Sequence, residues 1–340
     1  MVSWQAGIDT TLTTMAQLLK SRGYNTAGFV SHVVLKKASG LASGFDTYDD
    51  SVLDVGHPHK VSTAVKLTDL AIEYIQGVEK PFFVWIHYFD PHYRYLTHEE
   101  YRGFGDSTID RYDQEIAHTD RRIARLLRAV HAKGEIDNTA IIFTSDHGEE
   151  FGERDGSGHR TLYDEVLRVP FVIRLPGGAS GVDDRPVEQV DVLPTIYGLL
   201  GMERPDLPGH DLLAPKTDDD RWLYSERQFP PLWSQQSVRN SRFKLMVVED
   251  VDTALIAKSM IPNLPKIRID VQNVIAGIYL FDLVADPGET KNIYSESHQD
   301  GRDLLVSLVE YMESGSPVES PRIEVDEETL KKLRSLGYIQ

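Results

Sequence analysis

Residues 139–148 have the sequence Thr-Ala-Ile-Ile-Phe-Thr-Ser-Asp-His-Gly. The apolar, β-branched run predicts a buried strand over Thr139–Ser145, and Asp146, His147 and Gly148 follow its end. Open α/β sheets place their ligand sites at the carboxyl ends of parallel strands. A carboxylate oxygen beside an imidazole nitrogen is able to hold Zn, Mn or Ca, so this stretch predicts a metal site. The structural alternative is a polar turn that Asp146 caps.

Helices and strands alternate around this segment. The spacing of apolar residues predicts helices over Thr10–Ser21, Ser62–Gln76, Asp110–Ala132 and Val187–Gly201. Apolar runs predict further strands over Thr26–Ser31, Pro81–Tyr88 and Val169–Leu175. Asp9 or Thr10 is the expected cap of the first helix. Residues 41–50 and the Gly-rich stretch up to about Gly158 are expected to be loops. The alternation predicts an α/β fold with a mostly parallel sheet flanked by helices.

The pattern changes after about Pro215. Short strands of an antiparallel sheet are expected over Arg221–Glu226, Gln236–Asn240, Phe243–Val248 and Gly277–Leu283. Helices are expected over Gln299–Met312 and Asp326–Leu336, with a Ser- and Pro-rich connection between them. We therefore predict two domains, an α/β core over residues 1–215 and a small antiparallel subdomain with terminal helices over residues 216–340.

Composition narrows the classes of function. The chain has 340 residues, with 36 Lys plus Arg against 53 Asp plus Glu, a formal net charge of -17. This charge argues against nucleic-acid binding, because phosphate contacts need a basic surface. The chain has no cysteine, which excludes disulfides, thiolate metal sites and a cysteine nucleophile within it. We expect no membrane span and see no signal peptide, and the compartment and the oligomeric state stay open.

Four blocks of sequence resemble the sulfatase family of the alkaline-phosphatase-like superfamily. The long block from Phe143 to Ile173 has the family's order of Ser-Asp-His-Gly, Thr-Leu-Tyr-Asp-Glu and Arg-Val-Pro. The other three blocks are Phe82–His92, which ends in Asp-Pro-His, Val190–Thr195, and Leu280–Asn292 with its Asp-Pro-Gly-Glu turn. The resemblance extends over nearly the whole chain and implies the alkaline-phosphatase-like fold, with the family's first strand missing.

The resemblance also implies roles for four residues. Asp146 and His147 occupy the positions of metal ligands, and the family's metal is Ca, although His147 makes Mn or Zn a reasonable alternative. His92 occupies the position of a residue that contacts the sulfate or protonates the leaving alcohol, work that suits a histidine. His159 stands where relatives place a Lys or His that contacts the sulfate. The structural alternatives are a turn residue for His92 and a solvated loop histidine for His159.

The family's nucleophile has no counterpart in the 340 residues. Sulfatases use a formylglycine made from the first residue of a Cys/Ser-x-Pro/Ala-x-Arg motif. No cysteine is present, and the serines at Ser316 and Ser320 lack the spacing. Asp9 precedes a predicted helix, so it does not match the acidic ligands of the family's first strand. We therefore expect a fragment, or a truncated gene model, whose nucleophile is encoded upstream of Met1.

The sequence favours a metal-dependent hydrolase that cleaves sulfate esters, R–O–SO3, of small anionic molecules or carbohydrates. A phosphodiesterase or phosphonate monoester hydrolase of the same superfamily is the nearest alternative, because sulfate and phosphate esters present similar tetrahedral anions. A Thr or plain Ser nucleophile would favour this alternative. A third hypothesis is a non-catalytic binding protein that keeps the fold, which becomes the first choice if the 340 residues are the whole mature protein.

Overall fold

The computed structural model describes residues 7–9, 12–54, 61–178, 180–215, 221–229, 233–250, 277–294, 298–314, 327 and 331. The chain forms two compact units, Met1–Ala140 with Pro317–Gln340, and Ile141–Ser316. Each unit is described by itself below. The domain division that we predicted after residue 215 stays a prediction. Among the described residues, no helix has the length and apolar character that a membrane span requires.

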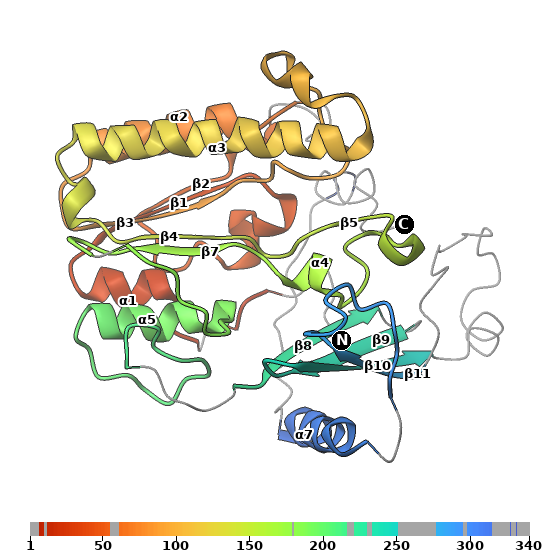
Figure 1. Cartoon of the computed structure of the whole chain (residues 1–340). Helices are drawn as coiled ribbons and strands as arrows, with labels where there is room; N and C mark the ends of the chain where they lie inside the picture. The colour runs from red at the N-terminus through yellow and green to blue at the C-terminus, as the bar shows by residue number, and fades with distance from the viewer. Residues whose placement is uncertain are drawn as a thin grey trace. The chain divides into compact units, whose positions relative to one another are not determined.

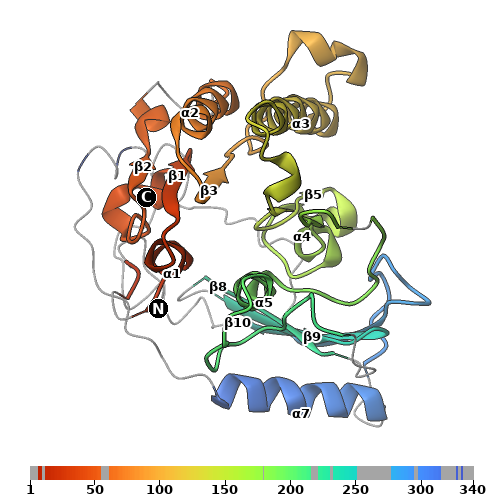
Figure 2. The same cartoon turned by 90° about the vertical axis from the view of Figure 1, so that its left-hand side faces the viewer.

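The first unit is built on a parallel sheet of three strands. The order is β2 (Thr47–Asp49), β1 (Asn25–Val30), β3 (Phe82–His87), and both pairings are parallel. Helices α2 (Ala64–Gly77) and α3 (Thr108–Ala132) cover one face, and α1 (Met15–Ser21) lies on the other (Figures 1 and 2). Strands and α2 meet in a buried cluster of Ala27, Phe29, Val52, Leu67 and Ala71. The predicted parallel, helix-flanked sheet is confirmed.

Two local predictions for this unit are wrong. The first helix begins at Met15, because Thr14 caps it through a capping box with Gln17. The expected caps, Asp9 and Thr10, lie before that start. Residues 47–49, which we expected to be loop, form β2, whose three residues are too few to show an alternating pattern. The unit also contains 3-10 turns at Val33–Leu35, Lys37–Ser39, Ser51–Asp54, Glu99–Phe104 and Ile136–Asn138.

In the second unit, β4 (Ile141–Thr144) pairs with β7 (Phe171–Arg174) in the antiparallel sense. We predicted that both would be parallel strands. A parallel pair needs a crossover, which is normally a helix. Only the short hairpin of β5 (Glu150–Phe151) and β6 (Ser157–Gly158), a 3-10 turn at Glu153–Asp155 and the four-residue α4 (Asp164–Leu167) separate β4 from β7. The polar loop after β4 is thus partly a hairpin.

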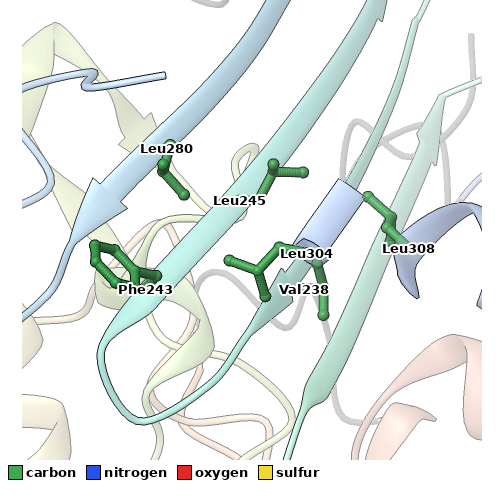
Figure 3. Close-up of a cluster of buried hydrophobic side chains, with 6 residues drawn as sticks. All are labelled: Val238, Phe243, Leu245, Leu280, Leu304 and Leu308. Carbon is green, nitrogen blue, oxygen red and sulfur yellow. The ribbon is translucent and has the colours of Figure 1, made fainter. Parts of the chain in front are cut away.

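The same unit contains the antiparallel sheet that the sequence predicted. Its order is β11 (Gly277–Asp282), β10 (Phe243–Asp250), β9 (Trp233–Arg239), β8 (Leu223–Phe229). Helix α7 (Gln299–Ser314) packs on one face, where Leu304 and Leu308 meet side chains from the strands. The buried side chains of this face are Val238, Phe243, Leu245, Leu280, Leu304 and Leu308 (Figure 3). The predicted helix Asp326–Leu336 and the Ser- and Pro-rich connection at residues 315–321 fall almost wholly outside the described residues.

The opposite face of this sheet packs against the segment that includes α4. Met246, Val248 and Phe281 form a buried cluster there with Leu162. Along β10, Leu245 faces α7 whereas Met246 faces Leu162, as the two-residue repeat of a strand requires. The sheet is therefore buried on both faces, and its second face supports the polypeptide that follows β4.

A buried ion pair holds the start of α5 (Val192–Leu199) and its preceding 3-10 turn at Gln189–Asp191. Asp191 is fully buried, accepts hydrogen bonds from the Glu188 and His210 amides, and contacts Arg221 at 2.6 Å. Burial alone would raise the pKa of Asp191, but Arg221 and the backbone donors outweigh burial and lower it. The Asp191 of the Val-Asp-Val-Leu-Pro-Thr block thus has a structural role.

Candidate functional site

The turn after β4 brings the Asp146 carboxylate and the His147 ring together. Asp146 Oδ1 accepts a hydrogen bond from the His147 amide at 3.0 Å, whereas Oδ2 lies 3.7 Å from His147 Nε2. The Asp146 side chain is 73% exposed and that of His147 is 37% exposed. One carboxylate oxygen and one imidazole nitrogen therefore face each other at a solvent-accessible turn.

The tautomer of His147 follows from its backbone partner. Nδ1 lies 2.9 Å from the Gly148 carbonyl oxygen, so Nδ1–H is the donor and Nε2 keeps its lone pair when the ring is neutral. A hydrogen bond from the second ring nitrogen to a carbonyl is the usual arrangement for a histidine that ligates a metal. The neutral ring therefore has its free lone pair on the nitrogen that faces Asp146.

Two contacts from more distant residues hold this turn in place. The Gln189 side-chain amide donates to the carbonyl oxygens of Ser145 at 2.5 Å and Asp146 at 3.0 Å. The Gly148 amide donates to the Val166 carbonyl oxygen in α4 at 2.7 Å. The turn is therefore fixed from both sides, by the 3-10 turn before α5 and by α4.

His159 lies against His147 in the same unit. The two rings stack with centroids 4.1 Å apart and planes inclined by 27°. His159 Nδ1 is 3.3 Å from Glu149 Oε1, and the Glu149 side chain is only 8% exposed. The sequence prediction missed Glu149. The β5–β6 pairing, which places Glu150 opposite Gly158, explains how residues ten apart in the chain become neighbours.

His92 belongs to the first unit, at the carboxyl end of β3. Its ring stacks on Phe89 with centroids 4.2 Å apart, and its Nδ1 lies 2.5 Å from the Tyr93 carbonyl oxygen. As for His147, a contact with a carbonyl oxygen assigns Nδ1–H as the donor. The backbone amide of His92 donates to Glu115 at 3.2 Å. The structure brings Asp146, His147 and His159 together in the second unit, whereas His92 belongs to the first.

Asp90, two residues before His92, has a structural role. Its side chain is buried, and Oδ2 accepts hydrogen bonds from the Thr63 amide, the Thr63 hydroxyl and the Ala64 amide. These donors lie at the N-terminus of α2, where unpaired amides and the helix dipole favour a carboxylate. The Asp of the Asp-Pro-His block therefore ties the end of β3 to α2.

Charged residues at α4 connect it to the antiparallel sheet. Lys244, whose side chain is fully buried, contacts Asp164 Oδ1 at 3.0 Å and Glu289 Oε1 at 2.7 Å. Arg239 also contacts Asp164, at 2.9 Å. Burial alone would raise the pKa of Asp164, but Lys244 and Arg239 outweigh it and lower the pKa. The Tyr-Asp-Glu and Asp-Pro-Gly-Glu blocks therefore meet in a buried ionic cluster behind the Asp146 turn.

The donors at the Asp146 turn fit part of a cation site. Asp146 Oδ2 and His147 Nε2, which lie 3.7 Å apart, are the kinds of donor atom that would hold a divalent cation. Within the described residues, no group of three or more His, Asp or Glu side chains is arranged to hold a metal ion. Asp146 and His147 therefore offer two donor atoms, and a complete coordination shell needs more.

The comparisons with known proteins point to one protein family. A family model described as Sulfatase matches residues 2–202. The chain is 26% identical over 236 residues to an uncharacterized sulfatase, YidJ, of Escherichia coli K12, covering 57% of this chain and 47% of that protein. The chain spans about half, or less, of the length of the curated relatives it matches.

Solved structures support the same fold. One is described as a protein in complex with its substrate D-glucosamine-2-N,6-O-disulfate, with a TM-score of 0.67, 18% identity, and coverage of 92% of this chain and 84% of that one. Another is the phosphonate monoester hydrolase of Agrobacterium radiobacter, with a TM-score of 0.67, 19% identity, and coverage of 91% and 81%. At these identities the likeness establishes the alkaline-phosphatase-like fold alone.

Proposed function

Because the chain belongs to the sulfatase family, we propose that it acts in the metal-dependent hydrolysis of sulfate esters, giving an alcohol and sulfate. The observation that carries the proposal is the pairing of Asp146 Oδ2 with His147 Nε2 on an exposed turn. The pair places a carboxylate oxygen and an imidazole nitrogen, both of them common metal-ligand atoms, side by side. Function is proposed from this site, since the fold also carries other activities.

In this proposal Asp146 and His147 are metal ligands. A bound divalent cation would neutralise negative charge on the sulfate group. Ca is the metal we propose on the family resemblance, and it accepts carboxylate oxygens readily. The imidazole also suits Mn or Zn, so the metal test includes both.

Two histidines are assigned to the substrate. We assign His159, whose Nδ1 lies 3.3 Å from Glu149 Oε1, to contact a sulfate oxygen through Nε2, a contact in which the protonated ring is the donor. We assign His92 to protonate the leaving alcohol oxygen from Nε2, because its Nδ1 contacts the Tyr93 carbonyl oxygen. The substrate class we propose is a sulfated carbohydrate, in line with the sulfated glucosamine bound by one structural neighbour.

The nucleophile is not assigned to any residue of the chain. A formylglycine, the family's nucleophile, requires a Cys or Ser in a motif that the 340 residues do not contain. The proposal for this chain therefore concerns metal binding, sulfate binding and protonation of the leaving group.

The first test measures metal binding by calorimetry. We expect the chain to bind Ca weakly, with Kd on the order of 10⁻⁴–10⁻³ M, because two ligands of a site give little affinity. Asp146→Asn removes the charge but keeps an oxygen that accepts from the His147 amide, and His147→Ala removes the nitrogen. Each variant should weaken binding by about tenfold or more. Mn and Zn are titrated in parallel.

Asp206→Asn is the matched control, because it removes an exposed carboxylate elsewhere in the same unit. Equal metal affinity in the wild-type chain and in Asp146→Asn would refute the assignment of the ligands. Sulfate release from an aryl sulfate and phosphonate release from an aryl phosphonate are then compared for the 340-residue chain and any longer form encoded upstream of Met1. Turnover of the phosphonate alone would favour the phosphonate hydrolase alternative.

A further inference from the structure

A buried carboxylate of α3 holds the segment that carries His92. Glu115 is 2% exposed, and each of its two oxygens accepts one backbone amide. Oε2 accepts from His92 at 3.2 Å, and Oε1 accepts from Leu96 at 3.1 Å. One side chain therefore closes residues 92–96 into a loop on the surface of α3.

The neighbouring residues of α3 continue the same attachment. Gln114, which is fully buried, accepts from the His98 amide at 2.9 Å and donates to the Gly105 carbonyl oxygen at 2.6 Å. The His118 ring, one turn further along the helix, stacks on the His98 ring with centroids 4.0 Å apart. Residues 92–105 are thus fixed to α3 at several points, and Glu115 provides the point nearest to His92.

A carboxyl group suits this position better than an amide side chain. The two amides of His92 and Leu96 both need an acceptor, and Glu115 offers an oxygen to each. A glutamine offers one oxygen, so its NH2 group would face the other amide. Retaining a carboxylate here costs free energy, because burial, followed by the charge of Asp90, raises the pKa of Glu115 to about 8.

We propose that Glu115 is a positioning residue that fixes the backbone at His92 and, through it, the direction of His92 Nε2. The inference rests on the proposed role of His92 as the proton donor. The amide of His92 is held by Glu115, its Nδ1 by the Tyr93 carbonyl oxygen and its ring face by Phe89. These three contacts act on different atoms of one residue and together restrict its orientation.

The first arm of the test measures hydrogen exchange of the His92 and Leu96 amides by NMR and needs no activity. Glu115→Ala should speed exchange of both amides about tenfold or more, because both lose their acceptor. Glu115→Gln should speed exchange of only one. Thr68→Val is the matched control, since it removes a buried hydroxyl of the same unit that bonds Tyr88 and the Ala64 carbonyl oxygen instead. Unchanged exchange at His92 in Glu115→Ala would overturn the proposal.

The pH dependence of stability gives a second, independent reading. The pKa of Glu115 is raised in the folded state, from 4.5 to about 8. The folded state therefore binds the Glu115 proton more tightly than the unfolded state does. The stabilisation that this proton gives is complete below pH 4.5 and is lost as the pH rises to about 8. Glu115→Gln, which does not titrate, should show a flatter dependence over this window, whereas Thr68→Val should keep the wild-type slope. Identical slopes in wild type and Glu115→Gln would count against the buried, raised pKa that we infer.

The last arm is a double-mutant cycle on sulfate release, made in whichever form of the protein releases sulfate, because the nucleophile is not assigned to the 340 residues. If Glu115 acts through His92, Glu115→Ala should lower kcat about tenfold to a hundredfold with little change in KM. Adding Glu115→Ala to His92→Ala should then lower kcat no further. A further loss of the same size in the double variant would mean that Glu115 acts by another route. If His92→Ala keeps full kcat, the proposed role of His92 fails, and the exchange arm still decides whether Glu115 holds the loop.

Discussion

Replacing Gly148 with alanine is expected to destabilise the second unit and to abolish metal binding at the Asp146 turn. A Cβ at this position would lie 2.1 Å from the Glu165 carbonyl oxygen and 3.1 Å from its carbonyl carbon, both of them backbone atoms of α4. Real Cβ atoms do not approach so closely, so the turn or α4 has to move. Because the Gly148 amide also donates to Val166, that movement breaks the hydrogen bond that holds the turn.

The size of the effect follows from the cost of overpacking. Forcing atoms into an already packed site costs typically about 1–3 kcal/mol, and more where backbone is the obstacle. We expect a loss of about 3 kcal/mol in the free energy of unfolding, measured by urea denaturation, together with loss of the calorimetric Ca signal. Metal binding is the more sensitive reading, because ligands displaced by about 1 Å no longer meet at one cation.

Gly181→Ala is the control for this experiment. Gly181 belongs to the same unit, and no heavy atom lies within 4 Å of the Cβ it would gain. The substitution should change the free energy of unfolding by less than about 1 kcal/mol and leave metal affinity unchanged. Wild-type affinity in Gly148→Ala would show that the Asp146 turn tolerates displacement, which is incompatible with a site built from Asp146 and His147.

The fold was predictable where the sequence has a clear period. The regularly spaced apolar residues of α2 and α3 and the apolar runs of β1 and β3 appear in the structure within a few residues of their predicted bounds. Strand β2 was missed, because it has only three residues and so shows no sequence pattern of its own. It is a strand because it lies beside β1 and pairs with it. The antiparallel sense of β4 and β7 was missed for a related reason, since a polar, Gly-rich stretch does not reveal a hairpin.

The sequence motifs identified the residues of the candidate site, but not the residues that hold them in place. Asp146, His147 and His159 come from recognisable blocks, and the structure brings them together through a ring stack at 4.1 Å. Gln189 holds the same turn from more than forty residues away, and nothing in its local sequence marks that contact. The many charged residues of α3 favour a solvated helix face, yet Glu115 is buried, because the segment of residues 92–105 covers it. Charge pattern alone does not show which side of a helix a loop will cover.

Lys244→Met, a change in the buried ionic cluster, is the second substitution for which we expect a large loss in the free energy of unfolding. This change removes the ammonium group that contacts both Asp164 and Glu289 while keeping a side chain of similar length. Arg239 still neutralises Asp164 in part, at 2.9 Å, but Glu289 loses the cation that offsets its burial. Removing one partner of a buried ion pair typically costs about 3–5 kcal/mol, and we expect a loss in that range.

The pH dependence identifies the cause of that loss. In the wild-type chain the pKa of Asp164 is lowered in the folded state. The contribution of ionised Asp164 to stability is therefore present above its unfolded pKa of 3.8 and is lost as the pH falls through the folded pKa. Without Lys244 both carboxylates should hold their protons more tightly in the folded state, because burial then dominates. The deficit of Lys244→Met relative to wild type should therefore shrink as the pH is lowered toward 4–5, the approximate range of free carboxylates.

Lys20→Met makes the same substitution in an exposed ion pair, where Lys20 is 49% exposed and its partner Asp46 is 42% exposed. Surface pairs contribute about 0–1 kcal/mol, so this control should unfold almost as the wild type does. If the two variants lost equal stability, or if the Lys244→Met deficit were constant with pH, the cluster would not act through buried charge. Because Glu289 also accepts the Asp164 amide at the start of α4, we further expect Lys244→Met to weaken metal binding at the Asp146 turn, whereas Lys20→Met should not. A buried cluster of this kind would give the carboxylates of the Tyr-Asp-Glu and Asp-Pro-Gly-Glu blocks a purely structural task, which is to hold α4 against Gly148.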